Sequence, residues 1–269
     1  MVFSDITSSR KFDGRSARRM LGWLAAFALL LSAPSFVSDY RLFQIGLVAS
    51  TSIIAAGLVI VMGVAGQISL AQAAFAALGA YGSTVLAQRA GVPQWIGIPL
   101  TAAAAGASGF ILGLLTLRVE GHNLALATMA LTAIVQVVIA HWESVTGGAL
   151  GLAVPPLRIA SVPLTSGAAL FYLIVPVAVA MFALAVNLLN SRVGRAFSAL
   201  RQSEIAAQIA GVNVLYYKAL AFACSAVFGA VGGGLQALQT TYLDPQAFGI
   251  LESVLFIAII VVGGFRSMA

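Results

Sequence analysis

Charge is the scarcest feature of this sequence. Only 8% of its 269 residues are charged and 61% are hydrophobic, whereas a soluble domain carries roughly 25% charged residues. A surface that faces water cannot be built from so few ionic side chains. Membrane lipid is the alternative solvent, and the composition therefore predicts an all-α protein, a polytopic bundle of transmembrane helices.

Groups that carry catalysis or bind metals are also scarce. Cys224 is the single cysteine, so the chain cannot form an internal disulfide, and its place in an apolar run indicates a packing role. His122 and His141 stand alone at opposite ends of one apolar stretch, which gives no cluster of metal ligands. The sequence has no GxxxxGK[ST] loop and no GxSxG turn. We predict no enzyme activity, no cofactor and no metal.

Long apolar runs dominate what is present. A helix needs about 20 apolar residues to cross about 30 Å of hydrocarbon, and eight candidate spans meet this requirement. The third is short, rich in small residues and preceded by Gly63 and Gly66, which makes it the candidate for a broken or re-entrant helix. The predicted spans are 20–38, 42–62, 68–88, 94–117, 123–142, 168–189, 217–240 and 248–265.

The basic residues predict the orientation of these spans, because lysine and arginine favour the cytoplasmic side. Eight spans with a cytoplasmic N-terminus leave only Arg41, Arg89 and Arg158 outside, out of 14 lysines and arginines. The basic segment 1–19 is then cytoplasmic, and residues 20–269 form the transmembrane domain. Residues 143–167 become an external loop and 190–216 a cytoplasmic loop. The net charge of +6 is read as an orientation signal, not as a nucleic-acid site.

The segment before the third span is unusual for membrane depth. It holds glycines and side-chain amides, which are tolerated there where backbone lines a cavity or is buried by protein. A broken helix also offers free backbone N–H groups to a carboxylate. A helix cap with ordinary packing is the alternative. The residues predicted to face a translocation path are Gly66, Gln67, Ser69, Gln72 and Phe75.

The segment 191–218 carries a second pattern. On a helical wheel Ile205, Ala206 and Ile209 share one arc, and Gly211 is placed to end a short helix. Such an amphipathic helix at the inner surface could dock into the groove of a cytoplasmic partner. A solvated connecting loop, or a helix lying on lipid headgroups, remains an equal alternative from the pattern alone.

Four ordered stretches carry a resemblance to a known family. Residues 66–81 are similar to a GQxSLGxAAFxGxGAY segment, and 118–130 (RVEGHNLALATMA) to RLRGxYLALATLA. Residues 142–152 (WESVTGGALGL) are similar to WxxLTGGxxGL, and 191–222 to SRxGRAxxAIRxxExAAxxxGxNVxxxKxxAF. From about residue 45 to 264, the chain resembles the LivM-type permeases of branched-chain amino acid ABC importers.

This resemblance implies a permease subunit in the bacterial inner membrane, surrounded by lipid. Its implied partners are a LivH-type second permease, two cytoplasmic ATPase subunits and a periplasmic substrate-binding protein. The inner segment would be the coupling loop to the ATPase. Its Glu204, Ala206, Ala207 and Gly211 match the EAA---G pattern of such permeases, and Arg195 and Arg201 flank it.

The sequence also departs from the family pattern. Ala71 and Gln72 stand where a Gly-His pair is frequent, and Asn123 stands where tyrosine is usual. These differences leave urea or short amides open as substrates, because relatives carry them. The family continues with a GSxxGP motif and further helix where this sequence ends at Ala269, so a truncated C-terminus is expected.

Other classes of protein remain as alternatives. A stand-alone secondary transporter would need buried ion-coupling groups and inverted repeats, but Glu252 is the only carboxylate that intrudes into a span, and no convincing repeat is found. A membrane enzyme or a sensor anchor would need a polar catalytic cluster or an attached soluble domain. A passive pathway subunit driven by a partner ATPase agrees best with the residues.

Overall fold

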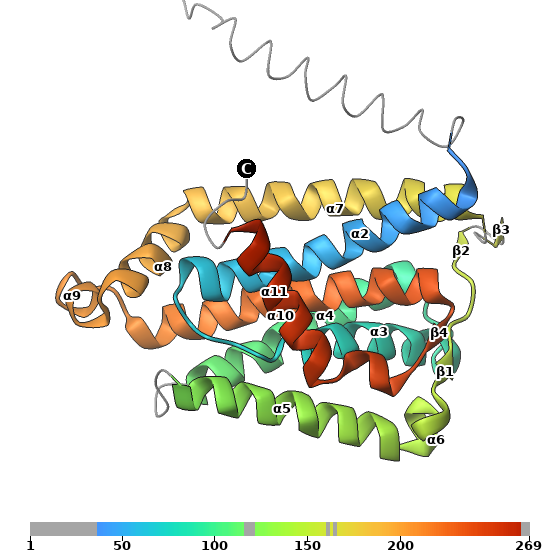
Figure 1. The fold of residues 1–269 in the computed structure, drawn as a ribbon, viewed down its shortest axis with the longest axis horizontal. Helices are drawn as coiled ribbons and strands as arrows, with labels where there is room; N and C mark the ends of the chain where they lie inside the picture. The colour runs from blue at the N-terminus through green and yellow to red at the C-terminus, as the bar shows by residue number, and fades with distance from the viewer. Residues whose placement is uncertain (1–36, 116–121, 160–161, 164–165, 265–269) are drawn as a thin grey trace, which may run out of the picture.

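The computed structural model describes residues 37–115, 122–159, 162–163 and 166–264. They form a bundle of helices joined by short connections (Figure 1). The predicted segment 1–19 and nearly all of the first predicted span lie outside the described residues. The elements are α2 (Asp39–Leu58), η2 (Val59–Val64), α3 (Gln72–Arg89), α4 (Gln94–Leu115), α5 (His122–His141), α6 (Glu143–Thr146), η4 (Gly148–Leu150), β1 (Leu152–Ala153), β2 (Arg158–Ile159), β3 (Val162–Pro163), α7 (Gly167–Asn190), α8 (Arg192–Gln202), α9 (Glu204–Ile209), α10 (Val214–Thr240), β4 (Tyr242–Leu243), η5 (Pro245–Phe248) and α11 (Ile250–Gly263).

Five helices in the described part of the chain are long and apolar enough to cross a membrane. They are α2 with η2, then α4, α5, α7 and α10, and each matches a predicted span to within a few residues. The helix α11 has 14 residues, which at 1.5 Å per residue is about 21 Å and short for a full crossing. The prediction of an all-α polytopic membrane protein is confirmed, whereas the count of eight spans and the cytoplasmic N-terminus stay predictions.

The connections gather at two opposite ends of the bundle (Figure 1). At one end β1 pairs antiparallel with β4, so that Leu152 lies opposite Leu243, and β2 pairs with β3. The Gln88 amide, at the end of α3, donates a hydrogen bond to the Ala153 carbonyl at this same end. The helices α8 and α9 lie at the other end. The segments predicted to be external and cytoplasmic are thus separated in space.

The helix α10 is the centre of the bundle and packs against α2, α3 and α4. Glycines make these contacts close. A Cβ at Gly109 of α4 would lie 2.6 Å from the Ala226 Cβ, and Gly79 of α3 lies directly against the Ala230 backbone. In lipid, where apolar burial drives association weakly, such small residues let helices approach. Gly113 of α4 lies in the same way against the Ala219 backbone, so α4 and α10 pack closely at two glycines that are four residues apart.

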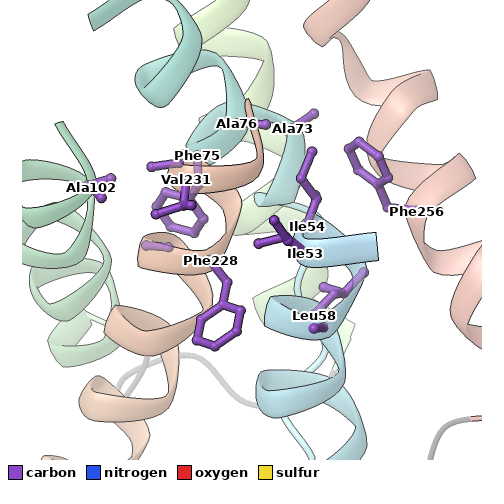
Figure 2. Close-up of a cluster of buried hydrophobic side chains, with 14 of the residues drawn as sticks. Ile53, Ile54, Leu58, Ala73, Phe75, Ala76, Ala102, Phe228, Val231 and Phe256 are labelled. Atoms are coloured by element: carbon purple, nitrogen blue, oxygen red, sulfur yellow. The ribbon is translucent and has the colours of Figure 1, made fainter. Parts of the chain in front are cut away.

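The apolar core lies where α2, α3 and α10 meet. Figure 2 shows Ile54, Phe75 and Phe228 within this buried cluster, with Phe256 of α11 beside it. Because Phe75 and Phe228 are fully enclosed, the core fixes how the start of α3 is placed against α10. This placement sets the geometry of the broken segment described next.

Candidate functional site

The chain unwinds between η2 and α3, as the sequence predicted. A π-helix, which is frequent at functional sites, ends at Val64, and residues 66–71 form no helix before α3 begins at Gln72. Gly66 adopts a positive φ of 73°, a conformation that glycine reaches at little cost. The unwound segment runs back into the bundle, and α3 begins partway along it (Figure 1).

Hydroxyl groups from other helices satisfy the backbone of this broken segment. The Leu70 N–H donates to Thr128 Oγ1 at 2.9 Å, and Thr132 Oγ1 donates to the Leu70 carbonyl at 2.7 Å. On α11, Ser253 Oγ accepts from the Ala73 N–H at 3.1 Å. Unpaired backbone groups are very unfavourable at membrane depth, so these bonds explain how the break persists there. Sequence reasoning missed these residues, although two hydroxyls four residues apart in an apolar span were an available signal.

Gln72 occupies a closed polar slot between three helices. Its Nε2 donates to the Ile54 carbonyl at 2.8 Å and to the Ser225 carbonyl at 3.4 Å, and its Oε1 accepts from Ser225 Oγ at 2.9 Å. Gly57 and Gly229 leave room for the amide, since a Cβ at either would approach Nε2 to about 3 Å. Gln72 is completely buried, and the slot therefore ties α2, α3 and α10 together.

Replacing Ser225 with alanine should destabilise the protein by about 1–3 kcal/mol, because Gln72 Oε1 would lose its buried donor. The thermal midpoint of the purified protein in detergent measures this effect. Ser52→Ala is a matched control, since among the described residues the Ser52 hydroxyl bonds only to the Val48 carbonyl of its own helix. An equal shift for both variants would contradict the assigned role of the slot.

The other residues predicted for the translocation path differ in exposure. Gly66 is exposed, whereas Gln67, Ser69 and Phe75 are buried like Gln72. Four of the five positions are thus enclosed by this chain in the conformation seen. The backbone of the broken segment is ordered and is lined by protein at membrane depth. The assignment of these residues to a translocation path stays a prediction.

The inner segment folds into two short helices instead of one. Ser191 is the N-cap of α8, and its hydroxyl accepts from the Val193 N–H at 3.1 Å. Ser203 is extended and is the N-cap of α9, where its hydroxyl accepts from the Ala206 N–H at 3.2 Å. Hydroxyl N-caps of this kind stabilise a helix start by about 1 kcal/mol. The predicted stop is confirmed at Gly211, which has a φ of +84°.

The helix α9 turns an apolar face to the outside of the chain. Ile205 is 74% exposed and Ile209 is 83% exposed, whereas Ala207 is buried. Ala206, which the helical wheel puts on the same arc as the two isoleucines, is also exposed. The two isoleucines thus form a small apolar surface that the described part of the chain leaves uncovered.

An ion pair anchors α9 to the start of α10. Lys218 Nζ lies 2.6 Å from Glu204 Oε2, and the side chains are 4% and 39% exposed. Lysine is almost never buried without a partner, so Glu204 compensates the Lys218 charge. The Glu204 of the family pattern therefore faces α10 and holds α9 in place.

The two flanking arginines have different surroundings. Arg195 is exposed, and its Nη1 donates to the Asn190 carbonyl at 3.4 Å. The guanidinium of Arg201 instead donates from Nη1 to the Gly63 carbonyl in η2. The side chain of Arg201 also lies against Gly66. The structure thus joins the inner segment to the broken segment, two regions that the sequence predicted separately.

These features define a multi-pass helical membrane protein with an interrupted helix in its core and a short helix, α9, that exposes apolar side chains at one end. A family model described as "Branched-chain amino acid transport system / permease component" matches residues 40–269, and the chain belongs to this family. The resemblance noted from the four motifs is therefore confirmed.

Curated relatives agree with this assignment. The chain is 29% identical over 279 residues to the "High-affinity branched-chain amino acid transport system permease protein LivM" of Escherichia coli strain K12, and equally to that of Salmonella typhimurium strain LT2. Each match covers 95% of this chain and 66% of the relative. The chain thus spans about two thirds of the length of these relatives. No solved structure matches the chain significantly.

Proposed function

We propose that the chain is a transmembrane permease subunit of an ATP-binding-cassette importer for branched-chain amino acids. The family match over residues 40–269 and the printed function of the two LivM relatives support this proposal. The chain would form the pathway across the bacterial inner membrane. Partner subunits would hydrolyse ATP, since the sequence carries no loop for its phosphates.

The single observation that carries the proposal is the form of α9. This short helix exposes Ile205 and Ile209, and the ion pair between Glu204 and Lys218 holds it against α10. A rigid apolar projection is suited to fill a groove in a cytoplasmic ATPase and to pass its motion to α10. This reading places the end that carries α8 and α9 in the cytoplasm.

The proposed assembly contains a LivH-type second permease, two ATPase subunits and a periplasmic substrate-binding protein. The binding protein would deliver substrate at the end where β1 and β4 pair. Closure of the ATPases would move α9, and the bundle would alternate between inward-open and outward-open states. Gly66, Gln67, Ser69, Gln72 and Phe75 would border the path in at least one of these states.

Replacing both Ile205 and Ile209 with serine should reduce substrate-stimulated ATPase activity of the assembled complex by about tenfold or more, because the docking face would lose its apolar contacts. The measurement uses the complex in proteoliposomes with leucine-loaded binding protein. Gln208→Ser on the same helix is the matched control, since Gln208 is exposed and already polar.

Three results would count against the proposal. Unchanged stimulation in the double serine variant would remove the docking role of α9. Uptake by the purified chain alone, without ATP, would favour a secondary transporter instead. Stimulation by a urea-loaded binding protein but not by a leucine-loaded one would move the substrate to urea or short amides.

A further inference from the structure

The contact between Arg201 and η2 occurs at a carbonyl that the backbone leaves free. The Ala65 N–H bonds to the Ile60 carbonyl, and the Gln67 N–H bonds to the Val61 carbonyl at 2.9 Å. No backbone donor among the described residues reaches the Gly63 carbonyl, which lies at the carboxyl end of the helix. The Arg201 guanidinium supplies the missing donor. A cation at this end also interacts favourably with the helix dipole.

Gly66 also packs closely against Arg201. A Cβ at Gly66 would lie 3.0 Å from Arg201 Cγ and 3.3 Å from Arg201 Cα. The arginine therefore lies directly on the residue where the helix ends and the broken segment begins. The positive φ of Gly66 and its missing side chain both favour this close approach.

Arg201 also stands at the last turn of α8, just before α9. In the described part of the chain no carboxylate lies within ion-pair distance of its guanidinium, so its anchor is the end of η2. A cavity of about 380 Å³, lined by Gly63, Val64, Leu189, Ser198, Arg201 and Gln202, adjoins the contact. This space allows the guanidinium to change its position when α8 moves.

We propose that Arg201 is the positioning residue through which the inner helices control the broken segment. This inference rests on the proposed function. When a partner displaces α9, α8 carries Arg201 with it and alters the end of η2, and residues 66–71 then change their arrangement. One side chain thereby connects the exposed apolar face of α9 to the interrupted helix. Arg201 acts within the chain and does not contact the ATPase.

The test compares Arg201→Ala, Arg201→Lys and Arg192→Ala in the assembled complex in proteoliposomes. Arg192 is the matched control, because it is an exposed arginine on the same helix whose side chain makes no hydrogen bond or ion pair with any other described residue. The first measurement is the ratio of substrate-stimulated to basal ATPase activity. We expect Arg201→Ala to lower this ratio about fivefold or more, Arg201→Lys to recover part of it, and Arg192→Ala to keep it.

The second measurement is hydrogen exchange of the amides of residues 66–71, with and without ATP and vanadate. In the wild-type complex nucleotide should change their exchange rates, and in Arg201→Ala this dependence should disappear. A residue with only a structural role would alter the rates in both states equally. Gly66→Ala, which pushes on the same contact, should lower the ratio too, and the double variant should lose less than the two single effects combined.

Several outcomes separate this inference from the proposed function. A wild-type complex without substrate-stimulated ATPase activity would overturn the proposed function and this inference with it. Stimulation in the wild type that Arg201→Ala retains, within twofold of Arg192→Ala, would overturn only the role of Arg201. Persistent nucleotide dependence of exchange at 66–71 in Arg201→Ala would do the same. Should Arg201→Ala fail to assemble, Arg201→Lys and Gly66→Ala decide the question by the same two measurements.

Discussion

Replacing Gly79 with leucine should prevent the chain from folding as a stable bundle. Gly79 of α3 lies against the backbone of Ala230, including its carbonyl oxygen and Cα. A side chain there cannot be accommodated by a rotamer change, because the obstacle is helix backbone. Overpacking in a tight core destabilises by about 1–3 kcal/mol, and we expect a loss above this range, since α3 and α10 would have to separate along their length.

The thiol of Cys224 allows a direct measurement of this effect. It is the single cysteine of the sequence and lies half-buried in α10, so a thiol-reactive dye reports unfolding of that helix during heating. Gly263→Leu is the matched control, because a Cβ at Gly263 meets nothing within 4 Å. A Gly79→Leu variant that melts at the same temperature as the Gly263→Leu variant would disprove the close approach of α3 and α10.

Removing the carboxylate of Glu204 should produce the second large effect. Lys218 is almost completely buried, and Glu204 is the residue that compensates its charge. Breaking a fully buried pair costs about 3–5 kcal/mol, because the remaining charge is left uncompensated. We expect about 2–3 kcal/mol for Glu204→Ala, since the 39% exposure of Glu204 lets water reach the site.

A double variant distinguishes this explanation from simple loss of a contact. Replacing Lys218 with methionine removes the buried charge itself, so Glu204→Ala combined with Lys218→Met should recover much of the stability lost by Glu204→Ala alone. The Cys224 dye assay measures all three variants under the same conditions. Strictly additive losses in the double variant would mean that the two side chains do not depend on one another.

Local sequence features were sufficient to predict the helices and the place of the break. Apolar runs set the bounds of α4, α5, α7 and α10, because hydropathy along one segment decides whether it can cross a membrane. Gly66 and the neighbouring amides predicted an interrupted helix, and the arc of Ile205 and Ile209 indicated a short helix at α9, with a solvated loop as an equal alternative. These predictions depend on residues close together in the chain, which is why the sequence alone could support them.

The contacts that organise the candidate site could not be predicted in this way. Arg201 reaches Gly63 across 138 positions, and Thr128 reaches Leu70 across 58. Glu204 and Lys218 are nearer in sequence, but the pattern alone left a solvated loop open, in which they would not meet. Each contact depends on how separate helices pack, and a single sequence gives no measure of that packing. The partition of α8 from α9 at Ser203 was missed for the same reason.

The pairing of β1 with β4 restricts movement at the end of the bundle that lies away from α8 and α9. The Val154 N–H donates to the Thr241 carbonyl at 2.8 Å, and the Tyr81 hydroxyl donates to the Leu243 carbonyl at 3.2 Å. Hydrogen bonds thus join the segments that follow α5 and α10 to each other and to α3. If substrate enters at that end, as proposed, the entrance cannot widen by separating these strands without losing the bonds, so β1, β4 and the end of α3 would move together as one rigid unit.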